Sequence, residues 1–183
     1  QRERMMRELE IAKAIQKAML PKVFPPFADR SDLNIYGMVR PAKEIGGDLY
    51  DFYVRHDKLF FCVGDVSGKG IPASLVMATI RSLFRSITAH VEHAHEVLIQ
   101  MNDTFAEQNE QNMFVTLFVG ILDLKTGELS YCNAGHNAPL IIRGEKAEVH
   151  TMDVHPNLPV GIMPRFACAE QKLQLAYGDT LFL

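Results

Sequence analysis

The sequence predicts an α+β domain in which mostly antiparallel sheets pack together and helices lie outside them. The order of the predicted elements supports this expectation: a helix comes first, strands and two helices follow, and the second half consists of short strands joined by turns. Strands joined by tight turns pair as antiparallel neighbours, and each sheet must bury its apolar face against another layer. No internal repeat or low-complexity segment interrupts this order.

The composition is that of one globular domain. Of the 183 residues, 48% are hydrophobic and 22% are charged, which provides enough apolar material for one sizeable core. The net charge of −3 gives no electrostatic reason to expect a nucleic acid or an anionic membrane as a partner. No apolar run approaches the ~20 residues that span a membrane, and we expect no signal peptide.

The three cysteines are odd in number, widely spaced and set in apolar, strand-like runs. They are Cys62, Cys132 and Cys168. This pattern predicts neither a disulfide framework nor a zinc cluster, and it fits a reducing compartment. We therefore expect a cytoplasmic protein.

Residues 1–20 predict a helix with two apolar stripes. At helical spacing, the first stripe consists of Met5, Leu9, Ala12, Gln16 and Met19, and the neighbouring one of Ile11, Ile15 and Ala18. This arc is wider than packing against one domain requires, so the helix has room for a second contact surface. Prolines at positions 21, 25 and 26 end the helix, and residues 33–39 then alternate well enough for a strand.

A hairpin is predicted next. Residues 49–54 and 59–63 are rich in aromatic and β-branched side chains, and a charged turn over residues 55–58 separates them. Folding the chain back at this turn brings Asp48, before the first strand, close to Asp65, after the second. Hard divalent cations prefer carboxylate, carbonyl and water oxygens, and nearby glycines allow backbone carbonyls to approach an ion. The facing aspartates therefore predict a metal site.

Parts of this stretch also fit three other interpretations. The run G-G-D-L-Y is similar to the signature of diguanylate cyclases, but those enzymes need an acidic residue where Leu49 stands. The run S-G-K-G is similar to a phosphate-binding loop, but that loop needs a glycine where Val63 stands and Ser or Thr where Gly70 stands. Both aspartates could also simply cap turns, although two of them at facing ends of one hairpin favour a shared site.

The remaining elements follow from periodicity and turn residues. Residues 71–91 and 97–109 predict two helices, and Pro72 suits the first turn of the former. Residues 113–124 and 129–133 predict a second hairpin, in which Gly127 takes an unusual φ. Four further strands are predicted over residues 140–143, 147–152, 168–175 and 180–183.

Four ordered motifs between Leu9 and Leu183 carry a resemblance to a known family. They are G-G-D-L-Y-D, G-D-V-S-G-K-G-I-P-A-S-L-V-M, N-A-G-H-N-A-P and Y-G-D-T-L-F-L. The chain resembles the bacterial SpoIIE/RsbU branch of the metal-dependent protein serine/threonine phosphatases, the phosphatase 2C-like (PPM) superfamily. The resemblance implies a layered α-β-β-α sandwich that hydrolyses phosphoserine or phosphothreonine, usually on small anti-sigma-factor antagonist (STAS-type) proteins in stress-response signalling.

The resemblance also implies a ligand set. Asp48 and Asp65 match the family's metal-ligating aspartates, and Val66 matches a position whose backbone carbonyl contacts a metal. Together they would hold two Mn²⁺ or Mg²⁺ ions, and the nucleophile would be a water activated by the metals.

Two departures from related phosphatases concern the phosphate and the leaving group. Lys43 occupies the spacing of an arginine that holds the phosphate, and lysine binds phosphate as a point charge without the bidentate fork of arginine. Ser67 stands where relatives outside this branch have a histidine that could protonate the leaving group. The leaving-group acid therefore stays unassigned, and the role of His136 in the third motif stays open.

A third departure concerns the C-terminus. In the family, Y-G-D-T-L-F-L runs directly into a Thr-Asp-Gly segment whose aspartate ligates metal, and a further acidic ligand follows. We expect residues 1–20 to be a linker or regulatory helix that connects an upstream sensor or receiver domain and can mediate a homodimer. We expect residues 21–183 to be a phosphatase domain lacking its C-terminal end, and therefore weak in metal binding and turnover. The alternative is a degenerate, non-catalytic module that binds a signalling partner.

Overall fold

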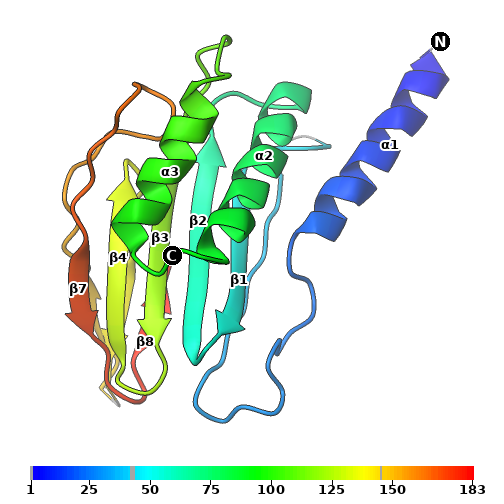
Figure 1. The fold of residues 1–183 in the computed structure, drawn as a ribbon. Helices are drawn as coiled ribbons and strands as arrows, with labels where there is room; N and C mark the ends of the chain where they lie inside the picture. The colour runs from blue at the N-terminus through cyan, green and yellow to red at the C-terminus, as the bar shows by residue number, and fades with distance from the viewer. Residues whose placement is uncertain (1, 42–43, 145) are drawn as a thin grey trace.

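The computed structural model describes residues 2–41, 44–144 and 146–183. These residues form three helices and two sheets, whose arrangement can be followed in Figure 1. The helices are α1 (Arg2–Met19), α2 (Ile71–Thr88) and α3 (Ala94–Ala106). The strands are β1 (Leu49–Arg55), β2 (Lys58–Val66), β3 (Val115–Asp123), β4 (Glu128–Ala134), β5 (Leu140–Arg143), β6 (Glu148–Thr151), β7 (Gln171–Gln174) and β8 (Thr180–Phe182).

The strands form two antiparallel sheets. The larger sheet has the order β1-β2-β3-β4-β7, and the smaller one has the order β6-β5-β8. Helices α2 and α3 lie side by side across one face of the larger sheet (Figure 1). The predicted α+β class and its antiparallel sheets are therefore confirmed.

Apolar side chains fill both faces of the larger sheet. Toward the helices, Phe60 of β2 and Leu117 of β3 pack with Met77 and Phe84 of α2, and all four side chains are fully buried. Toward the smaller sheet, Phe118 of β3 packs in a second cluster that includes Phe61, Tyr131 and Ile141. Because side chains alternate along a strand, each of the strands β1 to β4 contributes to both clusters.

The first hairpin forms as the sequence predicts. β1 pairs with β2 in a register that places Leu49 opposite Gly64 and Arg55 opposite Lys58. The turn consists of His56 and Asp57, which both have positive φ angles, of 48° and 56°. Two consecutive residues of this kind match the twist of the flanking strands. The turn thereby fixes which residues face each other at the far end of the hairpin.

The two apolar stripes of α1 have different environments. Leu9, Ala12 and Gln16, on the first stripe, are half-buried against the domain. Ile11 and Ile15, on the second stripe, are 60% and 59% exposed. No residue of α1 is fully buried. The helix therefore rests on the domain by one side only.

Several boundaries differ from those that the sequence predicts. The expected strand over residues 33–39 is wrong: the segment is extended and its side chains alternate in exposure, but it has no strand partner. Leu33 and Ile35 pack against the cluster that faces the smaller sheet. The side chain of Tyr50 lies against Gly37, so a ring fills space beside the segment. The helix expected over residues 97–109 begins three residues earlier, at Ala94.

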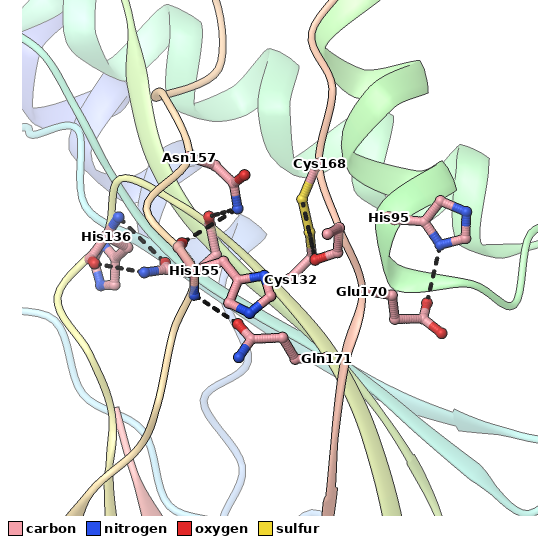
Figure 2. The surroundings of a disulfide bond; sticks show 10 residues. His95, Cys132, His136, His155, Asn157, Cys168, Glu170 and Gln171 are labelled. Carbon is pink, nitrogen blue, oxygen red and sulfur yellow. Dashed lines mark hydrogen bonds and ion pairs between the residues drawn. A yellow bond between two sulfur atoms is a disulfide. The ribbon is translucent and has the colours of Figure 1, made fainter.

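The cysteine pattern was also misinterpreted. Cys132 of β4 and Cys168 form a disulfide, shown in Figure 2, while Cys62 is free and buried. The two cysteines are 36 residues apart in sequence. β4 nevertheless pairs with β7, which begins at Gln171, so the segment that enters β7 runs beside Cys132. On the other side of that segment, Nδ1 of His95 of α3 lies 3.2 Å from a carboxylate oxygen of Glu170 (Figure 2).

A buried ion pair connects α2 to β1. The carboxylate of Asp51 has no exposed side-chain surface, and Arg85 donates to both of its oxygens, each at 2.6 Å. The Nε of Arg81, one helical turn earlier, lies 3.2 Å from the same carboxylate. No motif or spacing in the sequence marks these three residues as partners.

Candidate metal centre

Asp48 and Asp65 face each other at one end of the larger sheet. Leu49 pairs with Gly64, and one step beyond, the backbone N–H of Val66 donates to the carbonyl oxygen of Gly47 at 3.4 Å. The positions between these two pairs are Asp48 and Asp65. Because alternate residues share a face, Asp65 points to the side of Phe61, which is the side of the smaller sheet.

Gly47 allows the two chain segments to approach closely. A Cβ atom at this position would lie 2.8 Å from the Cβ of Val66 and 3.0 Å from its carbonyl oxygen. Real Cβ atoms do not tolerate the first of these distances, so only glycine fits here. The carbonyl of Val66 therefore lies against Gly47, where the backbone neighbours of Asp65 and Asp48 meet.

The two carboxylates influence each other electrostatically. Partial burial raises the pKa of Asp48, and the negative charge of Asp65 and a hydrogen bond with the Asp65 carboxyl raise it further. Two neighbouring carboxylates disfavour the state in which both are ionised. A divalent cation between them would remove this repulsion, and two carboxylates with one carbonyl match the oxygen ligands that Mg²⁺ and Mn²⁺ prefer. The residues therefore fit such an ion.

Thr116 and His136 extend the site across β3 and β4. Thr116 pairs with Asp65 in the register of β2 and β3, and its hydroxyl lies 3.4 Å from the carbonyl oxygen of Asp65. The same hydroxyl lies 2.9 Å from Nδ1 of His136. Burial lowers the pKa of His136, and the charge of Asp65 acts in the opposite direction. His136 is therefore a neighbour of the carboxylate pair.

Asn133 holds the loop that carries His136. Its side-chain amide donates to the carbonyl oxygen of His136 at 2.8 Å, and its Oδ1 accepts the backbone N–H of His136 at 3.2 Å. Asn157 belongs to residues 153–164, which we call the proline-rich loop. Its side-chain amide donates to the carbonyl oxygen of Asn133 at 2.8 Å (Figure 2). These hydrogen bonds fix the backbone of the loop at His136.

The proline-rich loop over residues 153–164 borders the site. Val160 exchanges two backbone hydrogen bonds with Val115, the first residue of β3, both at 2.9 Å. Val115 directly precedes Thr116. The loop is therefore attached to the end of the sheet at which the two carboxylates lie.

The structure brings together three of the four residues that the sequence predicts for the site: Asp48, Asp65 and Val66. Lys43, the fourth, lies outside the described residues. Thr116 was missed, and only the register of β2 with β3 reveals it. Within residues 2–41, 44–144 and 146–183, no group of three or more His, Cys, Asp or Glu side chains is arranged to hold a metal ion. Two carboxylates and a carbonyl are what this part of the chain offers.

Comparison with known proteins places the chain in a family. The model of the family described as Stage II sporulation protein E (SpoIIE) matches residues 55–183. The chain belongs to the SpoIIE family. Among its relatives, the phosphoserine phosphatase RsbU of Bacillus subtilis is 30% identical over 176 residues, which cover 96% of this chain and 51% of RsbU.

One more relative and one solved structure are similar to the chain. Protein IcfG of Synechocystis sp. (strain ATCC 27184 / PCC 6803 / Kazusa) is 30% identical over 202 residues, which cover 95% of this chain and 31% of IcfG. The solved SiaA-PP2C domain of Pseudomonas aeruginosa superimposes with a TM-score of 0.79 at 19% identity, covering 98% of this chain and 71% of that domain. The SiaA likeness establishes the phosphatase 2C-like fold.

The chain spans about half of the length of RsbU and less than a third of the length of IcfG. The similarity therefore covers only one part of each relative. In the described part of this chain, none of the helices has the length and apolar character needed to cross a membrane.

Proposed function

We propose that this SpoIIE-family protein hydrolyses phosphoserine or phosphothreonine on a signalling protein, using a water activated by divalent metal ions. The observation that carries the proposal is the facing pair of carboxylates, Asp48 and Asp65, with the carbonyl of Val66 beside them. The family relationship to RsbU supports the same reaction class. No cysteine or serine nucleophile is needed for this chemistry.

Asp48, Asp65 and the carbonyl of Val66 would hold the metal, which we propose to be Mn²⁺ or Mg²⁺, with two ions in the complete domain. When bound, such ions lower the pKa of a water to near neutrality and stabilise charge on the phosphoryl oxygens. The chain's own residues position this chemistry. Asp48 and Asp65 orient their oxygens from two paired strands, and Asn133 holds the loop of His136 beside them.

The proposed substrate is a phosphorylated anti-sigma-factor antagonist of the STAS type, in a cytoplasmic stress-response pathway. This choice follows from the SpoIIE and RsbU relationship. A non-catalytic module that binds the same partner is the alternative. Carboxylates that face each other favour the enzyme, because a binding module has no need to keep two repelling charges together.

Release of inorganic phosphate tests the function. The full-length protein, with Mn²⁺, is expected to release phosphate from a phosphoserine-bearing antagonist protein, and chelation of the metal should stop the reaction. Binding of the phosphoprotein without any release of phosphate, from a well-folded protein supplied with Mn²⁺, would favour the binding module instead.

We propose that Lys43 contacts the phosphate. Removal of one charged hydrogen-bond donor typically costs about 1.5–3 kcal/mol, so Lys43→Ala should raise the KM for the phosphoprotein by about tenfold or more. Lys125→Ala is a suitable control, because Lys125 is 76% exposed in the turn that joins β3 to β4. An unchanged KM in Lys43→Ala would remove Lys43 from the site.

We propose that residues 1–20 form a regulatory helix that connects an upstream sensor or receiver domain to the phosphatase domain of residues 21–183 and mediates a homodimer. The exposed stripe of α1, which includes Ile11 and Ile15, supports this surface. Sedimentation should show a dimer that dissociates when both isoleucines are replaced by glutamate, since a charge on this stripe cannot be buried in an interface. Identical monomers before and after the replacement would contradict the dimer.

A further inference from the structure

A glutamine of α1 holds the backbone of the turn that leads into Asp48. The side-chain Nε2 of Gln16 donates to the carbonyl oxygen of Gly46 at 2.6 Å, and the backbone N–H of Gly46 donates to Oε1 of Gln16 at 3.2 Å. One side-chain amide thus satisfies both polar groups of a single residue in another segment. Gly46 is separated from Asp48 only by Gly47.

The contact is well placed to influence the metal centre. Gly47 accepts the backbone hydrogen bond from Val66 and is the residue whose missing Cβ permits the close approach. Gly46 and Gly47 lack the side chains that would otherwise fix this turn through packing. The buried side chain of Ile45 anchors the chain before the turn. Between Ile45 and Asp48, the hydrogen bonds of Gln16 and Val66 hold the backbone of the two glycines.

A second contact of α1, an ion pair, is weaker than the hydrogen bonds of Gln16. Nζ of Lys13 lies 2.6 Å from Oε2 of Glu44, but these side chains are 51% and 55% exposed. Exposed ion pairs contribute little to stability and are screened by salt. The hydrogen bonds of Gln16 carry no formal charge and are partly buried, so salt does not screen them. Gln16 is therefore the stronger link between the helix and the turn.

The position of α1 depends on few contacts. None of its residues is fully buried, and Figure 1 shows the helix beyond α2 and the β1 side of the larger sheet. A helix with so little buried surface is held by individual interactions rather than by a core. Loss of the Gln16 contact would therefore loosen the helix as well as the turn.

We propose that Gln16 is a positioning residue for divalent-metal binding, which holds Gly46 so that Asp48 faces Asp65. The inference rests on the proposed function, since it requires the carboxylate pair to take a divalent cation. Coupling between two binding events is reciprocal. The factor by which a docked α1 strengthens metal binding is therefore the factor by which bound metal strengthens the docking of α1.

The test uses Gln16→Met, which keeps the length of the side chain and removes both hydrogen bonds. We expect the Kd for Mn²⁺, measured by titration calorimetry on the full-length protein, to rise about three- to tenfold, the effect of losing one or two ordinary hydrogen bonds. Mn²⁺ should slow amide hydrogen exchange in α1 of the wild-type protein but not in the variant. Gln100→Met, at an exposed position of α3, is the matched control and should change neither measurement.

Each outcome has one meaning. A Gln16→Met protein that binds Mn²⁺ as tightly as wild type would overturn the inference and leave the proposed function intact. A wild-type protein that binds no Mn²⁺ would overturn the proposed function, and this inference with it. If Gln16→Met does not fold, Gln16→Asn replaces it, because that side chain is one methylene shorter and cannot make both contacts. The same two results then decide.

Discussion

Replacement of Asp65 by alanine is expected to abolish Mn²⁺-dependent release of phosphate, with a fall in rate of at least about a thousandfold. Asp65 faces Asp48 from the end of β2, and Val66, which follows it, places its carbonyl beside the pair. With one of the two carboxylates gone, the proposed site would lose half of its charged metal ligands. The loss should therefore appear both in the affinity for Mn²⁺ and in the turnover of a phosphoserine protein at saturating metal.

The same substitution should leave the fold intact. The charge of Asp65 raises the pKa of Asp48, so at a pH at which both carboxylates are ionised the metal-free protein loses a repulsion when Asp65 is removed. We expect Asp65→Ala to have an unchanged or higher Tm without metal, and to lose the rise in Tm that Mn²⁺ produces in wild type.

Asp103→Ala, at an exposed position of α3, is the control for Asp65→Ala and should behave as wild type in both assays. If Asp65→Ala retained Mn²⁺-dependent turnover, the assignment of the carboxylate pair as the metal centre would be wrong. If neither the wild type nor the control released phosphate from the phosphoprotein, the non-catalytic binding module would be favoured instead.

The carboxylate pair could be predicted from sequence because its geometry is local. Two strand-like runs joined by a short charged turn pair in essentially one way, so Asp48 and Asp65 must meet. Thr116 and His136 could not be placed in the same way. Thr116 meets Asp65 only because β2 pairs with β3 across two intervening helices, and a sequence alone does not define the register of such a distant pair.

The errors in the predicted fold have the same origin. Alternation over residues 33–39 correctly indicates one apolar side, but it does not say whether a neighbouring strand is available, and here none pairs with it. Spacing made Cys132 and Cys168 look unrelated, whereas the pairing of β4 with β7 brings them together. Local periodicity therefore identifies elements and their buried faces, while contacts between distant strands need the structure.

Asp51 was overlooked because nothing in the sequence marks its partner. Asp48 and Asp51 are three residues apart at the start of β1, so they point to opposite faces of the sheet. Asp51 lies on the face covered by α2, where Arg85 meets it. A carboxylate toward an otherwise apolar helix layer requires a charged partner, and here that partner is supplied by the helix.

Replacement of Asp51 by alanine is expected to lower the free energy of unfolding by about 3 kcal/mol. Asp51 accepts two hydrogen bonds from Arg85 at 2.6 Å and one from the backbone N–H of Phe52 at 2.9 Å. Without the carboxylate, the partly buried guanidinium groups of Arg81 and Arg85 lose their shared counter-charge. The value lies at the low end for buried pairs because the side chain of Arg85 is 37% exposed. Urea denaturation measures the loss as a shift of the midpoint at constant slope.

Two further variants identify the source of that loss. The double variant Asp51→Leu, Arg85→Met should recover part of the stability, because apolar groups of similar size can replace a buried ion pair without a desolvation cost. The recovery is partial because Arg81, whose Nε lies 3.2 Å from the Asp51 carboxylate, still loses its counter-charge. Arg4→Ala, which breaks an exposed ion pair with Glu8, should change stability little. A single Asp51→Ala variant as stable as wild type would contradict the prediction. Recovery in the double variant would instead show that an uncompensated guanidinium, and not lost packing, destabilises the single variant.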